Sequence, residues 1–219
     1  PSKGLMYPED NPLSSGKVEI KYMTAKEEDI LTNSSFIRKG TVLDKLLESV
    51  MISKINIDDL IVGDKNAILI ATRILGYGSQ YEVEINGEKE TIDLSQLENK
   101  EFDESQITQG LNEFHFTLPY TKTPITYKIL TGSDEKKLER EIEGIKRIKK
   151  DSNPSLSTRL KYVITSVNGD VERKTINEFV DVYLLAKDSK ALRDHIKETQ
   201  PDVDLNVILD SGEEVVVPI

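Results

Sequence analysis

Side chains that could support catalysis or bind a metal are few and scattered in this chain of 219 residues. The sequence contains no cysteine, which excludes disulfides, thiolate nucleophiles and cysteine-based zinc sites. The two histidines, His115 and His195, lie far apart, and a metal site would require both to converge with carboxylates. His115 alternates with two phenylalanines on a predicted strand and should point outwards, and His195 lies on a predicted helix. We therefore expect two surface histidines and no metal.

Two further clusters could bind ligands, but each has a simpler interpretation. The glycine-rich stretch 76–79 lacks the lysine and the following helix of a phosphate-binding loop, so it should be a helix end followed by a turn. Asp58, Asp59 and Asp64 lack the spacing of a calcium loop, and Asp64 should cap a helix instead. No Ser-His-acid set or activated lysine stands out. We predict that the protein is not an enzyme, with no catalytic residue and no cofactor.

The composition is that of a polar globular protein, with 37% hydrophobic residues, 31% charged residues and a net charge of −10. A general binder of nucleic-acid backbones needs a basic surface, so we expect no nucleic-acid partner. No apolar run approaches the roughly 20 residues that a membrane-spanning helix requires, so we expect no membrane span.

The elements that would carry these residues occur in the same order twice. Runs 18–22 and 125–129 have the pattern of strands, and each is followed by Thr-x-x-acid, at Thr24 and Thr131, which is the signature of a capping box. Later in each half a helix should begin near Asp64 or Asp188. A similar number of residues then leads to a hairpin turn, at 86–87 in the first half and 211–212 in the second.

The middle of each half contains further predicted elements. Thr41 should cap a helix in the first half, and we match it to a capping box at Thr175, whose helix has Phe179 and Tyr183 on its apolar face. The second half also contains a longer charged helix and an extra hairpin over 162–172, turning at 168–169.

These patterns predict an α+β fold that is internally duplicated. Each half would be a strand, helices and a terminal β-hairpin, with an inserted long helix plus hairpin in the second half. The predicted organisation is an extended N-terminal arm at 1–16, a first repeat at 17–98, a linker at 99–112, and a second repeat at 113–219 with an insertion at about 139–174.

Two segments could contact partners because they are not needed to complete a repeat. The arm places Leu5, Met6, Tyr7 and Pro8 among turn-forming residues, and we expect it to pack on another chain. The alternative is that it folds back over the strand at 18–22. The long helix of the insertion has opposite charges four residues apart, which is typical of a solvated face, although it could also be a docking surface.

Several segments of the chain resemble the small baseplate hub proteins of T-even-type contractile-tailed bacteriophages (myoviruses). Together they span most of the sequence. The resembling segments are Pro1-Ser2-Lys3-Gly4 with Tyr7-Pro8, VEIKYMTAKEEDIL at 18–31, 60–81 with Asp64, Arg73 and Gly76-Tyr77-Gly78, and 188–218 with DSKALR and Pro201-Asp202-Val203-Asp204. Some relatives carry Cys-x-x-Cys pairs at the two hairpins, and because this chain has no cysteine there, no metal is carried over.

The resemblance implies a structural subunit of the baseplate hub, located in the virion after assembly in the host cytoplasm. Its partners would be tail-tube, hub or tape-measure proteins, and it would be oligomeric within the assembly. An alternative is a transient, chaperone-like assembly factor that is absent from the mature virion. An enzyme that acts on the cell wall is a third possibility, but the sequence has no recognisable pair of catalytic carboxylates.

Overall fold

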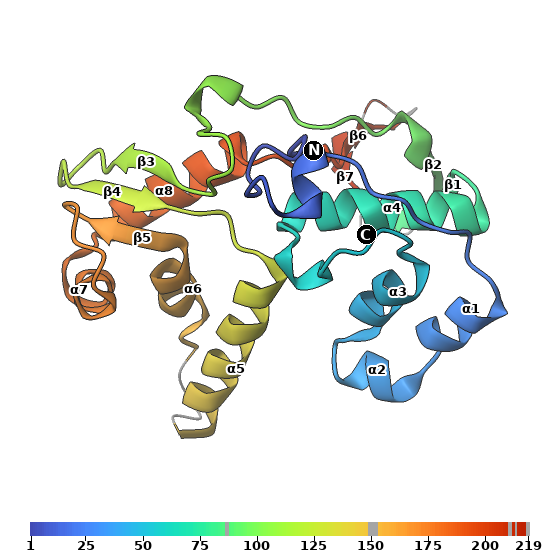
Figure 1. Ribbon diagram of the computed structural model, residues 1–219, viewed down its shortest axis with the longest axis horizontal. Coiled ribbons are helices and arrows are strands. Elements are labelled where there is room, and N and C mark those ends of the chain that lie inside the picture. Colours follow the sequence, from blue (N-terminus) through green and yellow to red (C-terminus); the bar gives the residue numbers. More distant parts are fainter. Residues whose placement is uncertain (86–87, 149–152, 210–211, 213, 218–219) are drawn as a thin grey trace.

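The computed structural model describes residues 1–85, 88–148, 153–209, 212 and 214–217, and it has the expected mixed α+β fold. Most of the first half lies on the right of Figure 1 and most of the second half on the left. The halves meet where the start of α5 (Gly132–Ile148) packs on the short 3₁₀ turn η2 (Ile57–Asp59), and the Gly132 N–H donates to the Leu60 carbonyl at 2.9 Å.

The first half is mainly helical. The capping box predicted at Thr24 is present, with the Glu27 carboxylate accepting from the Thr24 N–H at 2.8 Å. The hairpin is also confirmed, with Gln80 opposite Asp93, whereas its turn at 86–87 lies outside the described residues. The elements are η1 (Pro12–Ser15), α1 (Ala25–Leu31), α2 (Ser34–Arg38), α3 (Val42–Val50), α4 (Val62–Tyr77), β1 (Gln80–Ile85) and β2 (Glu88–Asp93).

The second half is built around a three-stranded antiparallel sheet in the order β3-β4-β5. Helices α6, α7 and α8 surround this sheet, and α5 projects away from it (Figure 1). The elements are β3 (Phe114–Thr117), β4 (Pro124–Tyr127), α5 (Gly132–Ile148), α6 (Ser155–Val163), β5 (Ile164–Val167), α7 (Arg173–Glu178), the π-helical turn η5 (Phe179–Tyr183), α8 (Ala186–Thr199), β6 (Asn206–Ile208) and β7 (Glu214–Val216). Short 3₁₀ turns, η3 (Leu94–Gln96) and η4 (Glu104–Gln106), lie in the segment that joins the halves.

The hairpin predicted over 162–172 is wrong. The turn itself forms, with positive φ at Asn168 and Gly169, but β5 precedes it and helix α7 follows it. β5 pairs with the distant β4 instead, because this pairing buries Ile164 and Val167 in the core of the second half. Thr175 is not a helix cap either, since α7 begins at Arg173 and the Thr175 hydroxyl donates to Asp170 at 2.8 Å.

A lysine, a threonine and an acid make the same contacts in both halves. In each half the lysine pairs with the acid, at 2.9 Å in the first and 2.8 Å in the second, and the threonine N–H donates to that same acid. The acid is buried in both cases. The two sets are Lys21, Thr24 and Glu27, and Lys128, Thr131 and Asp134.

A second shared contact shows which helices correspond. The Lys21 N–H donates to the carbonyl of Val50, the last residue of α3, at 2.8 Å. The Lys128 N–H donates to the carbonyl of Val163, the last residue of α6, at 2.9 Å. The counterpart of α3 is therefore α6, so the match to the helix at Thr175 is wrong. The extra elements of the second half are β3, the extension of α5 and the segment from α7 to η5.

Three buried apolar clusters form the core. One lies in the second half, and one joins the arm to α3, α4 and Ile129. The third packs both terminal hairpins against α4, so the last hairpin of the chain completes the core of the first half. Its buried members are Ile70, Val83, Ile92, Leu94, Val203 and Val217.

Candidate functional site

The N-terminal arm is tied to α4 by Asp64. The Ser2 N–H and hydroxyl donate to the Asp64 carboxylate at 2.9 and 2.5 Å, and the Tyr7 hydroxyl donates to it at 2.7 Å. The same hydroxyl accepts from the Ile61 N–H at 3.1 Å. Burial and the nearby carboxylate raise the pKa of Tyr7 well above its ordinary value. Asp64 therefore anchors the arm, and the expectation that its side chain caps the helix is wrong, because Ile61 occupies the N-cap.

The arm folds back onto its own chain. Met6 and Tyr7 are buried in the cluster that includes Leu47 of α3, Leu5 is half-buried and Pro8 is exposed. The expectation that the arm packs on another chain is therefore wrong for Met6 and Tyr7, since their apolar surface is already covered. The arm packs there because burying its apolar side chains against the core of its own chain removes their surface from water, and this is favourable without any partner.

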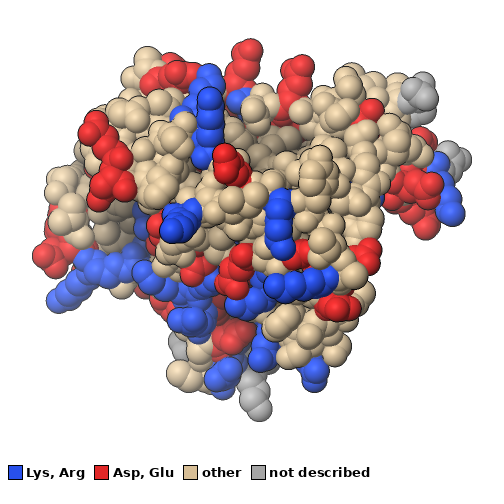
Figure 2. Space-filling view, turned by 45° about the vertical axis from the view of Figure 1, so that its right-hand side comes forward, with Lys and Arg blue, Asp and Glu red and all other residues tan. Residues whose placement is uncertain are grey.

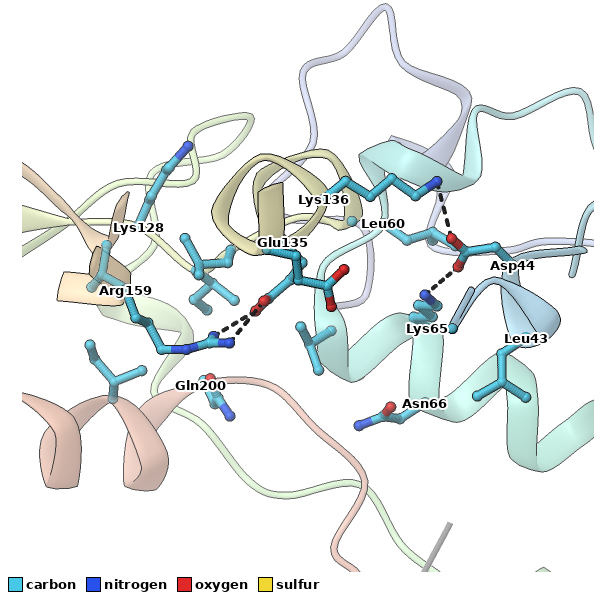
Figure 3. Close-up of a pocket in the computed structure, with 18 of the residues that line it drawn as sticks. Leu43, Asp44, Leu60, Lys65, Asn66, Lys128, Glu135, Lys136, Arg159 and Gln200 are labelled. Atoms are coloured by element: carbon cyan, nitrogen blue, oxygen red, sulfur yellow. Dashed lines mark hydrogen bonds and ion pairs between the residues drawn. The ribbon is translucent and has the colours of Figure 1, made fainter. Parts of the chain in front are cut away.

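A central cleft of about 600 Å³ lies between the two halves. Its walls come from α3 and α4 on one side and from α5, α6 and the end of α8 on the other (Figure 3). Apolar residues form part of the lining, including Leu43, Leu60 and Leu156. Figure 2 shows Lys and Arg side chains gathered in a band across the lower part of one face, interspersed with Asp and Glu.

Asp44 on α3 is the centre of an ion-pair network in this cleft. Its carboxylate lies 2.5 Å from the Lys65 ammonium and 3.0 Å from that of Lys136, and Figure 3 shows both lysines pointing at it. Lys136 also lies 2.5 Å from Asp58. Burial by itself raises the pKa of Asp44, but the two lysines outweigh it and hold that pKa below its ordinary value. The network joins α5 of the second half to α3 and η2 of the first.

A second ion pair lies on the other wall of the cleft. The Arg159 guanidinium of α6 donates to both carboxylate oxygens of Glu135 on α5, at 2.6 and 2.8 Å. This bidentate geometry fixes the two helices against each other. The cations Lys65, Lys136 and Arg159 are thus all paired with carboxylates, and of these pairs those of Lys136 hold the two halves together.

The two histidines do not converge. His115 is exposed, as expected, whereas His195 is half-buried beneath β3 and does not lie on the open surface. The Phe116 ring stacks on His195 with centroids 4.5 Å apart, and Tyr127 meets it edge-on at 5.8 Å. Burial lowers the pKa of His195. The prediction failed because Phe116 arrives from a strand far away in sequence.

The remaining sequence candidates have structural roles. α4 ends at Tyr77 and is followed by Gly78 with φ of 86°, so the glycine-rich stretch is a helix end, as predicted. Asp59 accepts from Asn11 and Asn56. In the described part of the chain no group of three or more histidines and carboxylates could hold a metal ion. No helix there is long and apolar enough to cross a membrane.

An exposed apolar patch, not predicted from the sequence, lies at the outer end of the second half. The expected apolar helix face changes to the π-helical turn η5, and this turns Val182 and Tyr183 towards solvent. Leu185 follows. Tyr120 is held to the segment just after it, since its N–H donates to Asp188 at 2.8 Å and its ring lies 5.3 Å from the Lys187 ammonium. The exposed fractions of these side chains are 68% for Val182, 58% for Tyr183, 51% for Leu185 and 58% for Tyr120. We name Tyr120, Val182, Tyr183 and Leu185 the η5 patch.

Searches of protein-family models, of curated proteins and of solved structures found no match to this chain.

Proposed function

We propose that this protein is a structural subunit of a bacteriophage baseplate hub that contacts tail-tube, hub or tape-measure proteins. The observation that carries the proposal is the resemblance of segments spread from Pro1 to Pro218 to the baseplate hub proteins. The segments at 18–31 and 188–218 include Glu27 and Asp188, two buried acids that hold backbone N–H groups in the fold. The resemblance thus includes residues on which the architecture depends.

The η5 patch supports a role in protein–protein contact. Exposed aromatic and aliphatic side chains that lie together mark interaction surfaces more often than scattered ones do. Tyrosine is also enriched among residues that dominate binding energy, and π-helical turns recur at functional sites. The patch contains two tyrosines and two aliphatic residues on the outer end of the second half.

Mass spectrometry of mature tail particles tests the proposal. Presence of the protein in a fixed ratio to the other hub proteins is the expected result. Its absence from mature particles, together with its presence in assembly intermediates, would favour the transient assembly factor. Absence from both would overturn a role in the baseplate.

A variant of the η5 patch tests the surface separately. Val182→Asp combined with Tyr183→Asp should reduce incorporation into particles, while the matched variant Ile148→Asp, at the exposed end of α5, should not. Both variants should keep the melting temperature of the parent protein within a few degrees, since these side chains contribute little to the core. Normal incorporation of the double variant would exclude the patch as the contact.

A further inference from the structure

In the second half, β3 fills the space between strand β4 and helix α8. Phe114 lies opposite Tyr127 and Phe116 opposite Ile125 in the antiparallel ladder. Both phenylalanines are half-buried, and Phe116 stacks on His195 of α8. The strand therefore pairs with the outer backbone edge of β4, and its Phe116 ring covers His195 of α8.

The first half has counterparts of β4, β5 and α8. The segment 18–22 corresponds to β4, because Lys21 and Lys128 occupy equivalent positions beside Val50 and Val163. One of its edges is paired, with the Ile52 N–H donating to the Glu19 carbonyl at 2.8 Å and Ile20 bridged to residue 51.

The other edge of this segment is open. In an antiparallel ladder successive residues direct their backbone groups to opposite sides. Since Glu19 and Lys21 bond to the 50–52 segment, Ile20 directs its N–H and carbonyl away from it. Neither group of Ile20 makes a hydrogen bond within the part of the chain that the structure describes. In the second half the equivalent residue, Tyr127, faces Phe114 of β3.

An apolar groove of about 600 Å³ runs beside this edge. Its floor is α4, which corresponds to α8 because Asp64 and Asp188 each stand third in their helix and hold an incoming segment. His195 lies seven residues after Asp188, and Ala71 lies seven residues after Asp64. In α4 the small side chain of Ala71 thus stands where α8 has His195, the ring on which Phe116 of β3 stacks. The groove is lined by Val18, Ile20, Ala67, Ala71, Ile74 and Leu75, among others.

We propose that this groove accepts an extended segment of a partner protein, which adds to 18–22 as an antiparallel strand. The segment would carry large apolar or aromatic side chains at alternate positions, as β3 does with Phe114 and Phe116, and these would lie on Ala67 and Ala71. Main-chain hydrogen bonds to Ile20 would supply affinity, and the alternate side chains would supply specificity. This inference does not depend on the baseplate proposal, because it concerns a strand-accepting site whatever the assembly.

A peptide copying residues 112–118 (Asn-Glu-Phe-His-Phe-Thr-Leu) is the probe, titrated into the full chain by fluorescence anisotropy and followed by amide NMR shifts. The expected result is saturable binding, with shifts at 18–22 and along α4. Ala71→Glu should weaken binding at least about tenfold, because the peptide would bury an unpaired charge. The matched variant Ala25→Glu, on the exposed face of α1, should bind like the parent protein. Absence of binding at millimolar peptide, or shifts confined to other elements, would overturn the proposal.

Backbone methylation distinguishes strand addition from any other mode of binding in the groove. N-methyl groups at the two phenylalanine positions of the peptide should abolish binding, because by the register of β3 those N–H groups would face Ile20 and Val18 at the open edge. An N-methyl group at the histidine position should be tolerated, since that N–H points outwards. Equal effects at both kinds of position would refute strand addition. The melting temperature of Ala71→Glu, measured without peptide, confirms that the variant is folded.

Discussion

Replacing Asp44 with asparagine should destabilise the protein by about 2 kcal/mol. Removing one partner of a fully buried ion pair costs about 3–5 kcal/mol, whereas exposed pairs contribute about 0–1 kcal/mol. The side chain of Asp44 is 14% exposed, and those of Lys65 and Lys136 are 27% and 34% exposed, so this network lies between the two limits. Lys136 keeps Asp58 in the variant, and Lys65 loses the one carboxylate that it contacts in the described part of the chain. Asparagine has nearly the same volume as aspartate, so the decrease in the free energy of unfolding reflects the loss of the negative charge.

The effect of Asp44→Asn should depend on pH in a defined direction. The folded protein holds the pKa of Asp44 below its ordinary value of 3.8. The stabilisation is therefore fully present above about pH 4 and is lost as the pH falls through the lowered folded pKa. The gap in the free energy of unfolding between parent and variant should be full at pH 6 and should shrink towards pH 3.

Urea unfolding at low ionic strength is the appropriate assay, because guanidinium chloride would screen the ion pairs. Asp29→Asn is the matched control, since Asp29 is exposed on α1 and makes no ion pair in the described part of the chain. The control should change stability by less than about 0.5 kcal/mol. A variant at Asp44 as stable as the control, or a gap that does not change between pH 6 and pH 3, would refute this account of the network.

Three other outcomes follow from single contacts. Tyr7→Phe should cost about 1–2 kcal/mol in urea unfolding, because it removes two hydrogen bonds and leaves a buried N–H unpaired. Gly63→Ala should lower the melting temperature by several degrees, since a Cβ there would lie 2.0 Å from the Pro201 carbonyl oxygen; an unchanged temperature would place Pro201 elsewhere. His195 should titrate in NMR with a pKa below 6.5. The free energy of unfolding should therefore fall as the pH drops below 6.5, because the unfolded chain takes up the proton more readily than the folded one. A pKa above 6.5 would contradict the burial of His195 under β3.

Local signals in the sequence were sufficient for local structure. The capping box at Thr24, the start of a helix after Thr41 and the end of α4 at Tyr77 depend on neighbours within a few residues, and each was predicted correctly, although the Thr41 side chain makes no capping hydrogen bond. Both hairpins were also found from their alternating pattern and turn residues.

Features decided by distant residues were not predictable in this way. Asp64 has the position of a helix cap, but its hydrogen bonds go to an arm more than fifty residues earlier. The residues of β5 were expected to pair with those just after the turn at 168–169, but in the folded chain they pair with β4, about forty residues earlier. The central cleft depends on Asp44 and Lys136, which no pattern in the sequence brings together.

The position of the last hairpin has a consequence for synthesis of the protein. Val203 and Val217 are buried with Ile70 and Val83, so the hydrophobic core of the first half lacks part of its contents until the end of the second has been translated. We expect nascent chains that stop before residue 203 to expose α4 and the β1–β2 hairpin to chaperones and proteases. The two halves should accordingly unfold in one cooperative transition. Each half repeats the contacts of the other, but neither has a complete core of its own.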